Sequence, residues 1–309
     1  MSLYPDLKDI RVELQDHGIA VVYLDRPAAR NAFTDPMAKS LVVAFDRLDS
    51  DDKVKVVILA GSTNDGKAFC AGADLSKGDF STSERYTQNS ARNLNEHRDG
   101  GGTVSLALFR VRKPTIAAVN GHAVGIGITM TLAADIRLVS ETAKIGFVFA
   151  QRGIVPEAAS SYFLPKLIGH SRAMQLFMTA KVIPATSPIL DLLWASRHPS
   201  PEATVQAALD LAKDISLSNS MISSSLIKGL VWRGADNPED QHLLDSKAMH
   251  VAVTPISLGT GNSIDSKEGV QAFRDKRAPK MVATVPKDLP TEFYPWWSQK
   301  IITRAGAKL

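Results

Sequence analysis

The sequence of 309 residues has a single cysteine, Cys70, and this scarcity excludes two kinds of site. One cysteine cannot form a disulfide within the chain or supply a cysteine-based metal site, so we expect a reducing compartment. The seven histidines are scattered, and no pair has the spacing of a metal motif. We therefore predict no metal site.

Long apolar runs are also missing. No stretch of about eighteen apolar residues occurs, and the first residues do not form a charged-then-apolar signal segment. We expect neither a membrane span nor secretion. The net charge of +4 suits a small anionic ligand, but it is too weak and too dispersed to indicate nucleic-acid binding. Hydrophobic residues make up 44% of the chain, enough for a sizeable core.

The first half of the chain alternates strand-like and helix-like runs, which predicts an α/β fold. We predict strands at residues 10–14, 18–24, 54–60, 115–119, 136–139 and 143–147, and helices at 35–48, at the end of 81–112 and at 125–134. After Pro156 the strand signals fade, and helical patterns occur at 158–168, 171–180, 202–216, 219–232, 238–251 and 267–276.

These patterns divide the chain into three predicted parts. Residues 1–195 form a core with the ligand site, residues 196–280 form a helical region, and residues 281–309 form an irregular tail. The tail carries three prolines and the adjacent Trp296 and Trp297. Exposed aromatic side chains there would pack either on a neighbouring subunit or on their own chain.

The last three residues, Ala307, Lys308 and Leu309, differ by one small residue from the Ser-Lys-Leu peroxisomal address. This similarity predicts a peroxisomal location, with the import receptor as a partner. Chance similarity is the alternative.

Residues 67–75 contain three consecutive small residues, Ala71, Gly72 and Ala73, after a buried strand. Small residues let a ligand approach the backbone closely, although tight packing alone is the more common reason for such a run.

Residues 118–129 read as a strand that turns through glycines into a helix. The N-terminus of a helix presents unpaired N–H groups and a partial positive charge, which suits a developing oxyanion. The spacing GxGxxG is absent, so a dinucleotide fingerprint is not supported. His122 stands beside this turn as a base, a ligand-orienting group or, among its small apolar neighbours, a structural histidine.

Residues 153–162 place one carboxylate, Glu157, at the start of an apolar helix. The position suits an acid/base, and it equally suits a helix N-terminal residue placed for the helix dipole. Ser160, Ser161 and Tyr162 either line a pocket or continue the helix.

Together, the three motifs resemble the enoyl-CoA hydratase/isomerase superfamily, the crotonases, from about Ile10 to Ala278. Residues 25–33 are similar to the first CoA-contacting loop of that family, and residues 265–277 to its late helix. The resemblance implies a crotonase-type stack of ββα turns followed by a helical C-terminal region. It also implies a homotrimer or a hexamer of two trimers, an acyl-CoA substrate and no separate cofactor.

Carried over from the family, the oxyanion hole consists of the N–H groups of Ala73 and Ile126. The substrate-binding candidates around these two donors include Arg30, which would pair with a phosphate of CoA. The residues that would hold the nucleotide portion of CoA are Ala28, Arg30, Ala32 and Ala71, and the further candidates are Asp74, Leu75, His122 and Tyr162. Asp74 matches a position beside the adenine pocket, and an aspartate after a glycine turn also often caps a helix.

The family's hydratases activate water with two glutamates, and the matching positions here hold Thr129 and Phe149. Glu157 instead matches the single glutamate of the Δ3,Δ2-enoyl-CoA isomerases, especially the peroxisomal ones. The resemblance therefore predicts an isomerase of β-oxidation, in which one carboxylate moves a proton from C2 to C4 of a 3-enoyl-CoA. The alternatives are a hydratase or dehydratase acting on an unusual acyl-CoA and a non-catalytic CoA-binding protein.

Overall fold

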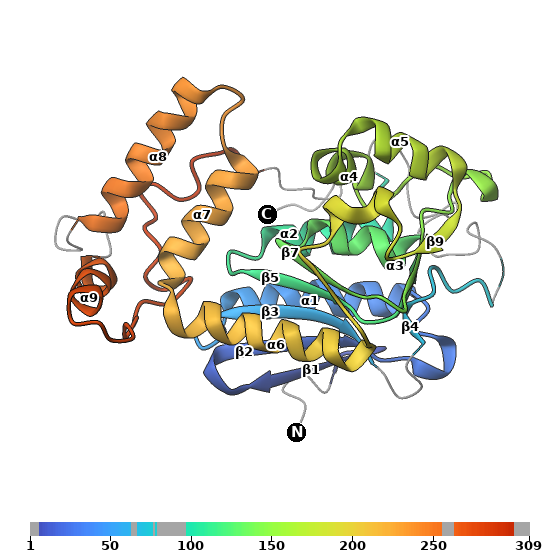
Figure 1. The fold of residues 1–309 in the computed structure, drawn as a ribbon, viewed down its shortest axis with the longest axis horizontal. Coiled ribbons are helices and arrows are strands. Elements are labelled where there is room, and N and C mark those ends of the chain that lie inside the picture. The colour runs from blue at the N-terminus through green and yellow to red at the C-terminus, as the bar shows by residue number, and fades with distance from the viewer. Residues whose placement is uncertain (1–5, 63–66, 77, 79–96, 255–262, 300–309) are drawn as a thin grey trace, which may run out of the picture.

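Two β-sheets form the centre of the protein, and helices cover both faces of the larger sheet (Figure 1). The structure, a computed structural model, describes residues 6–62, 67–76, 78, 97–254 and 263–299. The mixed α/β architecture with a helical C-terminal region confirms the predicted fold class.

The larger sheet has six strands in the order β1-β2-β3-β5-β7-β10. The first two strands are antiparallel, and all later neighbours in this sheet are parallel. The bounds are β1 (Ile10–Gln15), β2 (Ile19–Leu24), β3 (Val56–Gly61), β5 (Thr115–Val119), β7 (Ile136–Ser140) and β10 (Ser196–His198). Every residue of β3 is buried, as its continuous β-branched run predicts for a strand covered on both faces.

The smaller sheet has the order β4-β6-β8-β9 and carries the turns of the candidate site. Its strands are β4 (Ala68–Cys70), β6 (His122–Val124), β8 (Lys144–Gly146) and β9 (Val182–Pro184). The prediction that strands end at Pro156 was wrong, because β9 and β10 follow it. Strands of three residues, like these two and the unpredicted β4 and β6, are too short to show a period of two.

Helices pack on opposite faces of the larger sheet. On one face lie α1 (Asp35–Ser50) and α2 (Gly100–Arg110). The Thr34 hydroxyl caps α1 by accepting the backbone N–H of Met37 at 3.1 Å. On the other face lies α6 (Pro201–Ser218), whose small buried residues Ala208 and Ala212 pack against the sheet. This helix starts the predicted helical region, yet it belongs to the core by its packing.

The remaining helices form two groups. The first, α4 (Ser160–Ile168) and α5 (His170–Thr179), packs together beside the smaller sheet, and an apolar cluster joins it to the core. The second extends away from both sheets as an arm of α7 (Met221–Arg233), α8 (Pro238–Val253) and α9 (Ser263–Arg274) (Figure 1). The predicted helices after Pro156 are all confirmed, with ends shifted by a few residues.

Residues 281–299 of the tail contain no helix or strand and pack on the arm. The Trp296 indole N–H donates to the carbonyl oxygen of Arg233 at 3.2 Å, and its ring lies over Gly229. These aromatic side chains were expected to pack either on a neighbouring subunit or on their own chain. The structure shows them packed on their own chain.

No helix in the described part of the chain is both long and apolar enough to cross a membrane. Ala307, Lys308 and Leu309 lie outside the described residues, so the peroxisomal location stays a prediction.

Candidate active site

The first predicted oxyanion donor, the N–H of Ala73, lies on a turn that follows β4. Gly72 adopts φ +100° there, a conformation that glycine reaches without strain. Ala73 forms a parallel bridge with Phe33. The N–H of Phe33 donates to the carbonyl oxygen of Gly72 at 2.8 Å, and the N–H of Asp74 donates to the carbonyl oxygen of Phe33 at 2.9 Å. The bridge leaves the N–H of Ala73 itself without an acceptor among the described residues, which makes it available to a ligand.

The second predicted donor is the N–H of Ile126, the first residue of α3 (Ile126–Thr129). Gly125 precedes it at φ +55° and provides no side-chain cap, so this N–H also has no acceptor among the described residues. A 2.8 Å hydrogen bond from the N–H of Gly125 to the carbonyl oxygen of Gly146 anchors the turn on the smaller sheet.

The two turns lie against each other, which explains their glycines. A Cβ on Gly127 would lie 2.2 Å from the carbonyl oxygen of Cys70, and one on Gly72 would lie 3.1 Å from that of Val124. Only residues without a Cβ permit this approach. The structure thus brings the predicted donors together on neighbouring turns.

Glu157 lies just before α4, where Ala158 and Ala159 adopt positive φ angles of 59° and 54° that alanine rarely takes. Its Oε1 accepts a hydrogen bond from the Thr129 hydroxyl at 2.5 Å. Its Oε2 lies 1.8 Å from where a Cβ on Gly101 would be, and Cδ1 of Ile126 lies 2.4 Å from that point. The carboxyl group therefore meets Ile126, whose N–H is the second predicted oxyanion donor, at the first turn of α2.

Burial, with a smaller contribution from the nearby Asp99, raises the pKa of Glu157 from its usual 4.5 to about 8, against the opposite effect of the Thr129 hydroxyl. A carboxyl group with a pKa near the working pH can both accept and donate a proton. The arrangement can therefore carry out acid/base chemistry next to an oxyanion.

Sequence reasoning missed Asp99 and the glycines of residues 100–102. Asp99 caps α2 by accepting the N–H of Gly102 at 2.5 Å, and it also accepts the N–H of Ala158 at 3.3 Å. The sequence did contain a signal for this cap. An aspartate before three glycines at the start of an amphipathic run indicates a helix cap next to residues that have no side chains.

The predicted CoA loop, residues 25–33, is hydrogen-bonded to the segment that leads into the turn of Ala73. The N–H of Ala71 donates to the carbonyl oxygen of Arg30 at 3.1 Å. The buried Asn31 amide donates to the carbonyl oxygen of Ala68 at 3.0 Å. Ala28, Arg30 and Ala71 are exposed and Ala32 is partly buried, so the loop presents its predicted contacts to solvent beside the site.

Asp74 fastens this loop to the turn. It forms a 2.9 Å ion pair with Arg26 and accepts the N–H of Ser76 at 3.0 Å, interactions that lower its pKa. No helix begins at Asp74. Leu75, the next residue, has 45% of its surface exposed and lies at the same edge.

Neither His122 nor Tyr162 forms a hydrogen bond with Glu157 among the described residues. His122 Nδ1 accepts the N–H of Lys144 at 3.0 Å, and partial burial, Lys144 and Arg30 lower its pKa, so the imidazole is neutral. Tyr162 lines a cavity of about 1020 Å³ between the core and the arm, together with Trp232. Glu157 does not line that cavity.

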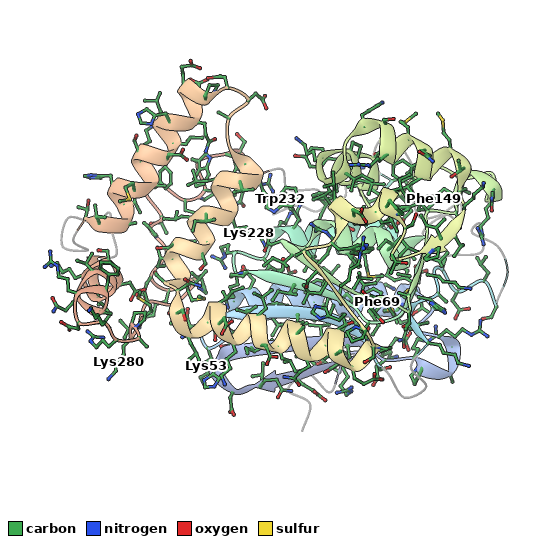
Figure 2. The ribbon with its side chains drawn as sticks, in the orientation of Figure 1. Lys53, Phe69, Phe149, Lys228, Trp232 and Lys280 are labelled. Atoms are coloured by element: carbon green, nitrogen blue, oxygen red, sulfur yellow. The ribbon has the colours of Figure 1, made fainter. Side chains whose placement is uncertain are left out.

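The two positions that hold glutamates in the family's hydratases are buried here. Thr129 is fully buried, and Phe149 is 3% exposed with its ring packed edge-on against Phe177. Figure 2 shows Phe149 on the side of the molecule away from Lys228 of the arm and from Lys280, which follows the arm. Among the described residues, no group of three or more histidine, cysteine, aspartate or glutamate side chains could hold a metal ion.

A family model described as enoyl-CoA hydratase/isomerase matches residues 15–283, most of the chain. The chain belongs to the enoyl-CoA hydratase/isomerase family. The recognition made from the motifs is therefore confirmed at the level of the family, and the protein is an enzyme of that family.

Known proteins of the family align over nearly the whole chain. Enoyl-CoA hydratase AFT3-1 of Alternaria alternata is 41% identical over 278 residues, which cover 90% of this chain and 88% of the relative. Enoyl-CoA hydratase ACTT3 of the same organism is 40% identical with the same coverage. The crystal structure of a probable enoyl-CoA hydratase/isomerase from Mycobacterium abscessus is 31% identical, with a TM-score of 0.75, and covers 89% of this chain and 98% of its own.

Proposed function

We propose that the protein is an enoyl-CoA isomerase of fatty acid β-oxidation, which moves the double bond of a 3-enoyl-CoA to the 2-position. The observation that carries the proposal is the partly buried carboxyl group of Glu157, which lies against the turn of Ile126. Thr129 and Phe149 cannot transfer a proton at neutral pH, so the pair of glutamates that hydration uses in this family has no counterpart.

In the first step of the proposed reaction, the thioester carbonyl oxygen accepts hydrogen bonds from the N–H groups of Ala73 and Ile126. These two bonds stabilise negative charge on that oxygen, and losing one such donor typically costs about 10²–10³ in rate. Ionised Glu157 removes a proton from C2, which leaves a dienolate. The same carboxyl group then returns the proton to C4, so the double bond ends between C2 and C3. The proposed reaction needs no cofactor, because CoA is part of the substrate.

Hydration is a second candidate, since the similar Alternaria proteins are named enoyl-CoA hydratases. In that reaction the Thr129 hydroxyl and Glu157, joined by a 2.5 Å hydrogen bond, would hold and activate a single water molecule. One carboxyl group would then serve as both base and acid.

A paired assay distinguishes the two reactions. Purified protein is given a 3-enoyl-CoA and, separately, a 2-enoyl-CoA of the same length. The isomerase proposal expects conjugated 2-enoyl-CoA from the first substrate and little hydration of the second. Formation of 3-hydroxyacyl-CoA from the second substrate, without migration of the double bond in the first, would favour hydration.

We also propose a homotrimer, alone or paired into a hexamer, as the family resemblance implies. Ile227 and Val231 on α7 are 60% and 77% exposed beside the cavity that Tyr162 lines, which supports a second copy of the chain covering this face. Light scattering on the wild type and on Val231→Asp tests this: a trimer or hexamer that the substitution dissociates is expected, and a wild-type monomer would contradict it.

A further inference from the structure

We propose that Asp99 is a positioning residue for Glu157, pairing with it across the first turn of α2 and keeping the shared proton on Glu157 in the resting enzyme. The two carboxyl groups face neighbouring glycines. A Cβ on Gly101 would lie 1.8 Å from Glu157 Oε2, and a Cβ on Gly102 would lie 2.6 Å from Asp99 Oδ2.

The glycines that begin α2 provide the space for this pair. All three residues of 100–102 are buried, and glycine is a poor helix former, so helix propensity does not explain the run. Any side chain at Gly101 would occupy the position of the Glu157 carboxyl group, and one at Gly102 would occupy that of Asp99. The missing side chains allow the two acidic groups to lie beside the first turn of α2.

Backbone hydrogen bonds hold the carboxyl group of Asp99 in place at the start of α2. Asp99 accepts N–H groups from Gly102 at the N-terminus of α2 (2.5 Å) and from Ala158, the residue next to Glu157 (3.3 Å). Both bonds are of the kind that a helix-capping carboxylate makes with backbone N–H groups. Asp99 raises the pKa of Glu157, because two neighbouring carboxylates do not both ionise readily, so the proton stays on Glu157.

The other groups around Glu157 do not compete for this proton. Thr129, from α3, does not titrate. Cys70, from β4, remains a neutral thiol, because burial, with a smaller contribution from Glu157, raises its pKa to about 12. Among the described residues, Asp99 is the charged group that acts on the ionisation of Glu157.

The pairing makes Glu157 a stronger base than a carboxylate in water. Once Glu157 is ionised, the neighbouring charge of Asp99 favours its return to the protonated form, and this drives removal of the C2 proton. The catalytic part of this inference rests on the proposed function, whereas the position of the proton does not.

The test is the pH dependence of kcat and KM for Asp99→Asn. Asparagine is as good a helix cap as aspartate, so α2 keeps its cap while the charge is lost. We expect the acidic limb of the kcat profile to move by about one unit to lower pH. Above that limb, kcat falls by roughly threefold because the base is weaker, and KM is little changed.

Two control variants separate positioning from folding. Ser200→Ala removes the cap of α6, where the Ser200 hydroxyl accepts the N–H of Ala203 at 3.1 Å, without touching Glu157. Its acidic limb should coincide with that of the wild type. Asp99→Ala should move the limb as Asp99→Asn does, with a lower melting temperature that asparagine rescues. A limb that stays at the wild-type pH in Asp99→Asn would overturn the proposal.

A second readout does not depend on activity. The difference in melting temperature between wild type and Glu157→Gln, followed against pH, reports the ionisation of Glu157 itself. In an Asp99→Asn background, the midpoint of this difference should move to lower pH. An unmoved midpoint would overturn the inference, whereas a moved midpoint in a protein without isomerase activity would overturn the proposed function alone.

Discussion

The hydroxyl group of Thr129 donates to Oε1 of Glu157 at 2.5 Å. This bond joins two positions that the family resemblance treats as belonging to different reactions. Thr129 occupies the place of a hydratase glutamate, and Glu157 occupies the place of the isomerase glutamate. Thr129 therefore does more than replace a hydratase glutamate. Its hydroxyl group is a hydrogen-bond partner of the Glu157 carboxyl group.

Removing the hydroxyl should make Glu157 harder to ionise. Thr129→Val keeps the shape of this buried side chain but loses the hydrogen bond, and that bond lowers the pKa of Glu157. We expect the acidic limb of the activity profile to move to higher pH and activity at pH 7 to fall by about tenfold.

The matched control is Thr131→Val. The Thr131 hydroxyl is also buried, but it donates to the carbonyl oxygen of Ile128 at 2.7 Å and does not reach Glu157. Its profile should coincide with that of the wild type. A limb that moves to lower pH in Thr129→Val would contradict the assigned role of the hydroxyl.

Replacing Ile126 by proline tests the oxyanion hole, because proline has no N–H. Ile126 is the first residue of α3, a position where proline is well tolerated. We expect kcat to fall by about 10²–10³ with a smaller change in KM. Ile126→Val keeps the N–H and should retain most of the activity. Equal rates for the proline and valine variants would remove this N–H from the mechanism.

Gly101→Ala should abolish activity by displacing the acid/base. The added Cβ would lie 1.8 Å from Glu157 Oε2, so the carboxyl group would have to move. A loss of at least about 10² in kcat is expected, since the base contributes that much. Gly269→Ala, on α9 where the nearest atom is 3.4 Å away, is the control and should leave activity unchanged. Full activity of Gly101→Ala would show that Glu157 does not need its present position.

Glu157 should make the wild type less stable as pH rises. Its pKa is about 8 in the folded protein and about 4.5 when unfolded, so the folded state holds one more proton between these values. Stability is then full below pH 4.5 and is lost progressively up to pH 8, at about 1.4 kcal/mol for each unit of pKa difference.

Glu157→Gln should lack this dependence. Chemical denaturation at pH 5 and pH 9 checks it: the free energy of unfolding of the wild type should fall relative to that of Glu157→Gln between the two values. A constant difference would mean that Glu157 ionises at the same pH in both states.

The oxyanion turns and Glu157 were predictable because short motifs encode them. A glycine turn that leads into a helix can be recognised from a few adjacent residues, and so can a single carboxylate that precedes a helix. Asp99 was not predictable in the same way, because its bond to the N–H of Ala158 joins residues 59 positions apart. Residues 97–99 lie where a polar stretch passes into the predicted amphipathic helix, and only tertiary packing brings Asp99 to Glu157.

Other differences have similar causes. Tyr162 is adjacent to the motif of Glu157 in sequence, but it projects from α4 into the cavity beside the arm, since neighbouring helix residues face different directions. The sequence allows His122 to be a base, a ligand-orienting group or a structural histidine, and its hydrogen bond to the backbone of Lys144 is visible only once β6 and β8 are paired.

The most direct test of the central claim is the rate at which wild type and Glu157→Gln convert a 3-enoyl-CoA to the conjugated 2-enoyl-CoA at pH 8.5. Glutamine keeps the size of the side chain and an oxygen to accept from Thr129, but it cannot carry the proton. The account predicts a loss of about 10²–10⁴ in kcat with KM nearly unchanged. Equal rates in the two proteins would contradict it.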